Sequence, residues 1–213
     1  MGILKNGLTG HVQGKIDGLV FYTRLGKNVS RKQATVTKPA SPLQAANRLK
    51  MGVVSKFLTP VLQFTNLGFR TYKVEAGGTA YNRATSEVKL NGLKGVYPDT
   101  AINFETIKLS KGKLTVAEGV SLEIVPSGIA FKWALDPEQR WPDATDQAML
   151  LVYFPEEEKA LHVLYGPQRS LGAAILPVST PMLTKEMHLF ISFISADRND
   201  VSESVYAGSL NLS

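Results

Sequence analysis

Cysteine is absent from this 213-residue chain, which excludes disulfide bonds, cysteine zinc sites and thiol catalysis. Histidine is scarce. His11, His162 and His188 lie far apart in the sequence, and none has a second His, Asp or Glu at the spacing of metal ligands. The sequence therefore predicts neither a bound metal ion nor a cofactor.

Long apolar runs are also absent. No stretch approaches the roughly 18 consecutive apolar residues of a membrane-spanning helix. The first ten residues contain no apolar run of signal-peptide length. We therefore expect a cytoplasmic protein without a membrane partner.

Acidic residues are rare in the first half of the chain. Residues 1–113 hold 18 Lys and Arg against 5 Asp and Glu, whereas residues 114–213 hold 6 against 13. The net charge thus changes from +13 to −7 along the chain, and the two values sum to the overall +6. This split predicts two structural units with different surfaces, a basic N-terminal region 1–113 and a domain 114–213.

The start of the chain predicts a small meander of strands over residues 8–33. Asp17-Gly18 separates two short apolar runs, and this dipeptide is a strong hairpin signal because glycine tolerates positive φ. Leu25-Gly26-Lys27 separates the next pair of runs. A linker over residues 34–42 follows.

Helical patterns come after the linker. Ser41 is placed to cap a helix that begins at Pro42, and Phe57 falls on its apolar face. Thr59-Pro60 should kink or restart this helix, which then continues to about residue 68. A further helix is expected from about 79 to 90, and residues 102–109 alternate partly, as in a strand.

The second half predicts seven short strands separated by turns, near 120–125, 128–134, 147–154, 160–164, 171–177, 187–195 and 202–209. The strands at 147–154 and 187–195 are apolar on both faces, which is typical of central strands. Seven strands with an early Trp133 predict an immunoglobulin-like or fibronectin type III-like sandwich. The expected fold is α+β and mostly β: an N-terminal hairpin or meander, two or three helices, and this C-terminal β-sandwich.

Three groups of residues also carry a family resemblance. They are Gly14-Lys15-Ile16-Asp17-Gly18-Leu19-Val20 with Arg24-Leu25-Gly26-Lys27 and Arg31; Ser41-Pro42-Leu43-Gln44-Ala45-Ala46-Asn47-Arg48; and Gln147-Ala148-Met149-Leu150-Leu151-Val152-Tyr153 with Phe190-Ile191-Ser192-Phe193-Ile194-Ser195-Ala196-Asp197. In this order, over nearly the whole chain, they resemble an uncharacterised bacterial family, domain of unknown function 6266. The resemblance implies a helical N-terminal part and a β-rich C-terminal part, and it implies no active site.

Catalytic motifs are not recognisable. The segment from Gly10 to Lys15 has too few residues between its glycines for a phosphate loop, and Ile16 stands where Ser or Thr would bind magnesium. His188 lies in an apolar strand, which favours a structural role. Acidic residues form two loops, Glu156-Glu157-Glu158 and a second with Asp136, Glu138, Asp143, Asp146 and Trp141. Both are typical of solvated surface loops, and the second could also bind a ligand or partner.

The basic N-terminal segment is the best functional lead. Residues 1–60 carry ten Lys and Arg residues against Asp17 alone, with Phe21 and Tyr22 among them. Cations interleaved with aromatics suit phosphate contacts and base stacking. The same cations could instead protect a sheet edge from aggregation, or dock on an acidic part of the same or a neighbouring chain. The candidate binding residues are Lys15, Tyr22, Arg24, Lys27, Arg31, Lys32 and Arg48.

From these patterns we expect a non-enzymatic binding or assembly protein that works through protein–protein contacts or self-association. The first alternative is a nucleic-acid-binding protein that uses the basic strands. The second is an enzyme with a site that the sequence does not reveal.

Overall fold

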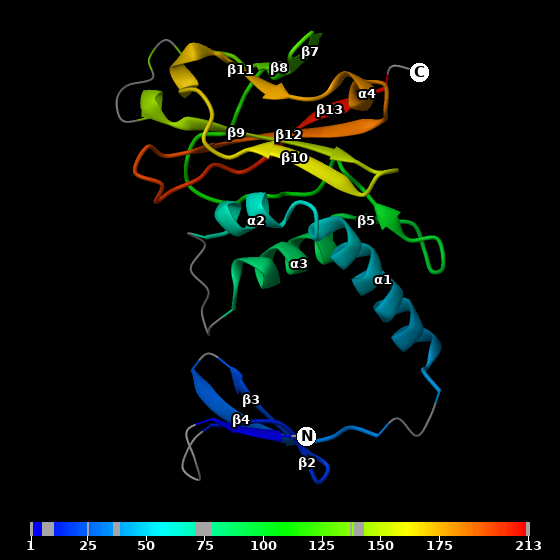
Figure 1. Ribbon diagram of the computed structural model, residues 1–213. Coiled ribbons are helices and arrows are strands. Elements are labelled where there is room, and N and C mark those ends of the chain that lie inside the picture. Colours follow the sequence, from blue (N-terminus) through cyan, green and yellow to red (C-terminus); the bar gives the residue numbers. More distant parts are fainter. Residues whose placement is uncertain are drawn as a thin grey trace. The chain divides into compact units, whose positions relative to one another are not determined.

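The computed structural model describes residues 2–5, 11–24, 26–35, 39–70, 78–136, 138 and 143–211 (Figure 1). The fold is mostly β: the described strands form four antiparallel sheets, and a few helices accompany them. The chain divides into two compact units, Met1–Leu43 and Gln44–Ser213. Each unit is described separately below.

The N-terminal unit contains the meander predicted for residues 8–33 and one further strand, β1, that was not predicted. Strands β1 (Gly2–Lys5), β2 (His11–Ile16), β3 (Leu19–Arg24) and β4 (Lys27–Lys32) form one sheet in sequential order. Asp17 and Gly18 join β2 to β3 with φ values of 42° and 73°. Both residues are thus left-handed, as a two-residue turn of this kind requires.

Three helices open the second unit near the predicted positions. They are α1 (Pro42–Leu58), α2 (Leu62–Gly68) and α3 (Ala80–Asn91). Helix α1 begins at proline, whose fixed φ suits the first helical turn, and the chain breaks around Pro60 as expected. The Thr79 hydroxyl accepts a hydrogen bond from the Asn82 amide at 3.2 Å and caps α3.

Two larger sheets follow the helices. The first has the order β10-β9-β12-β13 and the second β11-β8-β7. Their strands lie close to the predicted positions: β7 (Ser121–Val125), β8 (Gly128–Lys132), β9 (Gln147–Phe154), β10 (Lys159–Val163), β11 (Ala173–Pro177), β12 (Met187–Ile194) and β13 (Val205–Leu210). A small hairpin of β5 (Leu93–Lys94) and β6 (Ala101–Ile102) and a short helix α4 (Thr180–Leu183) complete the unit.

The four-stranded sheet is covered on both faces. In β9, Leu150 and Val152 point into a core shared with β8 and β11, whereas Leu151 and Tyr153 point into a core shared with the helices. Figure 1 shows the resulting layers, with α2 and α3 on one side of the sheet and β7, β8 and β11 on the other. This burial explains why β9 and β12 are apolar at almost every position, as predicted for central strands.

The division into units falls at residue 43, whereas the change in charge falls at residue 113. The physical reason is that the helices have no core of their own. Phe57 of α1, Phe64 of α2 and Val88 of α3 share one cluster with Leu151 and Phe190 of the central sheet.

Opposite charges also meet across this junction. Lys56 of α1 pairs with Glu158 at 2.6 Å, and Lys108 approaches Glu203 at 3.8 Å. These two ion pairs join the basic part of the chain to the acidic part within one unit.

Residues 102–109 differ from the predicted strand. Only Ala101–Ile102 is extended in a sheet, and the remainder is turn and coil. Ile107 and Leu109 are nevertheless buried, because the segment packs against the helical core. The partial alternation of apolar residues in 102–109 therefore reflects the burial of Ile107 and Leu109 and not a strand. In the same unit, no described helix has the length and apolar character needed to cross a membrane.

Phe57 provides a test of the shared core. Its ring lies 5.0 Å from the ring of Tyr153 in an edge-to-face arrangement, and its side chain is buried. We expect Phe57→Ala to lower the free energy of unfolding by about 3–5 kcal/mol, as measured by urea denaturation. Lys56→Ala on the exposed side of the same helix turn is the control, and it should cost less than about 1 kcal/mol. Equal effects of the two changes would contradict the assigned helix face.

Truncation tests the unit boundary. The fragment 44–213 contains both core clusters and should unfold in one cooperative transition. The fragment 114–213 lacks the helices that cover Met149, Leu151 and Phe190, so it should bind a hydrophobic dye and unfold broadly. Cooperative unfolding of 114–213 without dye binding would instead support the boundary expected from the charge split.

Candidate functional site

The excess positive charge of the protein resides in the N-terminal unit. The chain has 24 Lys and Arg residues and 18 Asp and Glu residues. The first 43 residues hold seven and one of these, which leaves 17 of each kind for residues 44–213. The larger unit is thus neutral by formal count, and residues 1–43 carry the whole net charge of +6.

The strand register places most of the predicted binding residues on one face of this sheet. Lys15 lies opposite Val20, and Val20 opposite Arg31. Tyr22 lies opposite Val29, and Arg24 opposite Lys27. Because opposite residues share a face and side chains alternate along a strand, these positions form a single surface. We call it the basic face: Lys15, Val20, Tyr22, Arg24, Lys27, Val29 and Arg31.

The basic face has a simple layout. A row of Lys15, Val20 and Arg31 lies at one end, and the Arg24–Lys27 pair lies at the other. Tyr22 and Val29 fill the middle and are half-buried, whereas all four cations are exposed. Among the described residues, none of these four cations forms an ion pair. The face therefore presents unneutralised cations on both sides of an aromatic centre.

Two predicted binding residues lie elsewhere. Lys32 is opposite Leu19, which places it on the reverse face of the sheet. Arg48 belongs to α1 in the second unit. The reverse face, which we call the apolar face, carries Ile16, Leu19, Phe21, Thr23, Asn28, Ser30 and Lys32. Ile16 and Leu19 are 44% and 42% exposed.

The described side chains of the N-terminal unit form no buried core. Of the side chains described between Val12 and Leu43, none is buried, including those of Phe21 and Tyr22. A single antiparallel layer of this kind gains little from the hydrophobic effect, and hairpin-sized sheets need packing on one face for stability. This open layer sets the sheet apart from the second unit, whose central strands are buried.

The acidic loop after β8 borders a pocket with a volume of about 390 Å³. Asp136, Glu138 and Asp143 line it, as does Glu118, while Trp141 of the sequence prediction lies outside the described residues. Sequence reasoning missed Arg169, which also lines the pocket although it is only 6% exposed. Nothing in the residues around Arg169 signals this role.

Arg169 is rigidly held. Its guanidinium donates to the carbonyl oxygens of Thr115 at 2.7 Å and Val116 at 3.0 Å, and lies 4.2 Å from the centre of the Phe193 ring. The neighbouring Trp133 indole donates to the Arg169 carbonyl at 2.9 Å. These contacts join the two sheets at one end of their shared core, so the first role of Arg169 is structural.

Asp146 is the most perturbed carboxyl group of the described residues. It is 2% exposed, and its Oδ2 atom has no hydrogen-bond partner. Burial, with a smaller contribution from Asp143, raises its pKa to about 6, and Arg169 opposes this rise only in part.

His162 and His188 each contact a neighbouring element of the second unit. His188 Nδ1 lies 2.9 Å from the Tyr206 hydroxyl, and its ring stacks on Phe104 at 3.7 Å. Burial lowers the pKa of His188, and the nearby Glu186 opposes this shift weakly. His162 contacts Gln63 of α2 at 2.9 Å, and burial lowers its pKa as well. Both histidines are thus neutral near pH 7 and fix one element to another.

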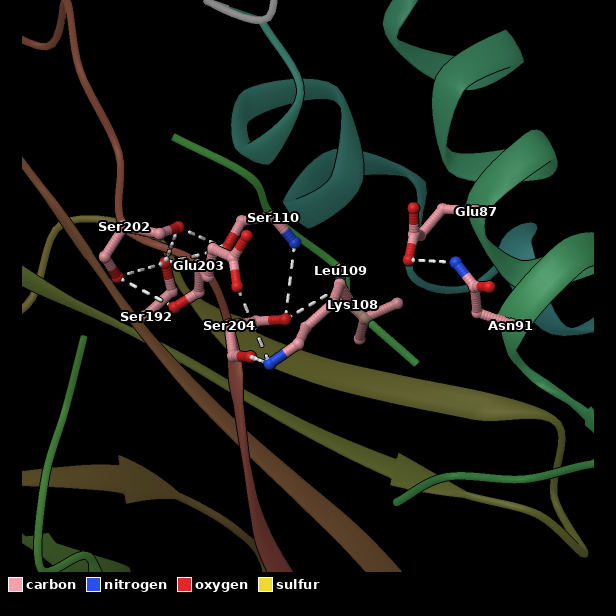
Figure 2. Close-up of polar contacts among 9 residues, drawn as sticks. All are labelled: Glu87, Asn91, Lys108, Leu109, Ser110, Ser192, Ser202, Glu203 and Ser204. Carbon is pink, nitrogen blue, oxygen red and sulfur yellow. Dashed lines mark hydrogen bonds and ion pairs between the residues drawn. The ribbon is translucent and has the colours of Figure 1, made fainter. Parts of the chain in front are cut away.

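Four buried serines form the most connected polar cluster of the second unit, and Figure 2 shows how they lie. The Ser110 hydroxyl oxygen lies 2.8 Å from both Ser192 Oγ and the Ser202 carbonyl oxygen. Ser204 accepts from the amide of Leu109 at 2.7 Å. The partners of these hydroxyls are serines and backbone groups, without a base to activate a nucleophile. The cluster attaches the 108–111 segment to β12 and its following loop.

Within the described ranges, no three His, Asp or Glu side chains converge in a way that could hold a metal ion. The carboxylates of the acidic loop border the Arg169 pocket without forming such a group.

The raised pKa of Asp146 gives a pH-dependent prediction. In the unfolded chain this carboxyl titrates near 3.8, and in the folded protein near 6, so the folded state binds the proton more tightly. The resulting stabilisation is complete below about pH 4 and is lost as the pH rises through 6. Asp146→Asn should therefore be more stable than wild type by about 3 kcal/mol at pH 8, with little difference below about pH 4. Urea denaturation across this range measures the effect, and equal stabilities of the two proteins at pH 8 would contradict the assigned role of burial.

Comparison with known proteins identifies one family. Residues 11–208 match the model of a Family of unknown function (DUF6266), a span that includes β2 to β4, the described helices and the two larger sheets up to residue 208 in β13. No curated protein and no solved structure matches the chain. The protein belongs to this family of unknown function.

Proposed function

We propose that the protein is a non-enzymatic assembly protein that acts through protein–protein contacts made by its N-terminal sheet. One observation carries the proposal: none of the side chains described between Val12 and Leu43 is buried, although Phe21, Tyr22 and Val29 are among them. Fixing a backbone residue costs about 1–2 kcal/mol in conformational entropy, so a sheet without an interior needs a covering surface.

The partner we propose is a second copy of the chain, which packs against the apolar face. Among its described side chains this face carries Ile16, Leu19 and Phe21 with Lys32 as the only cation, so two copies can approach with little repulsion. Two basic faces would instead bring eight cations together, which disfavours that pairing. Sheet-on-sheet packing of two identical faces is a closed, two-fold contact.

In this proposal the second unit is the part of each copy that lies outside the contact between the N-terminal sheets. We propose that its strands form a sandwich of the immunoglobulin or fibronectin type III class. Counted from β7, the first, second and fifth strands (β7, β8 and β11) share one sheet. The third, fourth, sixth and seventh (β9, β10, β12 and β13) form the other sheet. This order supports the assignment, since it differs from that of the immunoglobulin constant type only in the placement of the fourth strand. A cytoplasmic location is part of the proposal.

Analytical ultracentrifugation of the purified protein tests the contact. We expect a dimer at low micromolar concentration, and Ile16→Thr with Leu19→Thr should raise its Kd at least about 10-fold, because two partly buried aliphatic side chains are lost. Threonine keeps the preference for strands, so the sheet is retained. Leu90→Thr with Leu171→Thr, two exposed leucines of the second unit, is the matched control. A monomer at about 100 μM, or an equal loss in the control, would contradict self-association.

A further inference from the structure

We propose that the basic face binds single-stranded nucleic acid, independently of the contact made by the apolar face. Because the two faces point in opposite directions, a sheet covered on one side leaves the other side available. The ligand is inferred from the charge, the spacing and the aromatic centre of the basic face.

Charge is the first ground. Lys15, Arg24, Lys27 and Arg31 are exposed, and the only acidic residue of the N-terminal unit is Asp17, in the β2–β3 turn. Arg24 and Lys27 lie directly opposite each other, and like charges in this position destabilise a sheet. An anionic polymer removes this repulsion and releases its own counterions when it binds.

Spacing is the second ground. Val20 and Arg24 are four residues apart on β3, so the two cationic rows are separated by about 13 Å along the strand. Neighbouring strands are about 4.8 Å apart, and Lys15, Val20 and Arg31 lie across three of them. Phosphates can therefore be held at two ends while the bases between them lie over the middle of the face.

Tyr22 is the third ground. It lies between the two rows beside Val29, half-buried and on the same face as the cations. An aromatic ring flanked by cations is a platform on which any base can stack. The bases of a duplex are already stacked on one another, so this arrangement favours single strands over double-stranded DNA.

The test is fluorescence anisotropy with the full-length protein and labelled 20-nucleotide strands of DNA and RNA. The matching DNA duplex and polyglutamate are the comparison ligands. We expect single strands to bind more tightly than the duplex or polyglutamate, with a log–log salt slope of about −3 for four phosphate contacts. Arg24→Ala, Lys27→Ala and Arg31→Ala together should flatten this slope by about 2 and weaken binding at least about 10-fold.

A matched variant separates location from net charge. The control variant combines Lys32→Ala, Lys50→Ala and Lys113→Ala. It removes the same charge from the reverse face and from the second unit, and it should retain most of the affinity for single strands. Arg24→Lys with Arg31→Lys keeps the charge, so it should retain the slope and shows that the sheet tolerates changes at these positions. Tyr22→Leu should weaken binding about 5- to 150-fold, whereas Tyr22→Phe should not.

Three results would overturn the proposal. The first is no salt-sensitive binding of single strands, and the second is an equal loss of affinity in the two triple variants. The third is that polyglutamate binds as tightly as single strands and that Tyr22→Leu leaves its affinity unchanged. The last result would instead identify an acidic protein as the ligand of this face. Because Ile16→Thr with Leu19→Thr leaves the basic face unchanged, that variant should still bind nucleic acid. Failure of self-association and failure of this proposal are therefore separate outcomes.

Discussion

The second unit depends on the burial of β9 and β12 on both faces. A strand that is apolar at successive positions needs a layer on each side, and here the helices provide one and the β11-β8-β7 sheet the other. The serine cluster and the Arg169 contacts then attach the segments that run between these layers. Both sets of contacts hold polar groups between the packed layers of this unit.

The sequence predicted the helices and strands well because their patterns are local. Pro42, Asp17-Gly18 and the apolar runs at 147–154 and 187–194 each act over a few residues. The unit boundary could not be obtained in this way, since charge describes surfaces and the helical core forms only when distant strands meet. Arg169 was missed for the same reason: its partners Thr115 and Phe193 are distant in sequence.

The basic face was predictable from the sequence only in part. Its residues were predicted from composition, and the two-residue turn at Asp17-Gly18 already fixes which residue of β2 opposes which residue of β3. The second turn likewise sets Arg24 opposite Lys27. Lys32 could thus have been assigned to the reverse face from spacing alone. Arg48 could not have been excluded so simply, because its helix belongs to a different unit.

The confinement of the net charge to 43 residues also affects how the protein behaves in solution. The intact chain has an isoelectric point near 9.4, whereas residues 44–213 have equal numbers of acidic and basic side chains. Proteolysis in the segment between β4 and α1 would therefore turn a strongly basic protein into a nearly neutral one without disturbing either core cluster. The two forms would separate on a cation exchanger at neutral pH, and only the intact chain would be drawn toward anionic surfaces at low ionic strength.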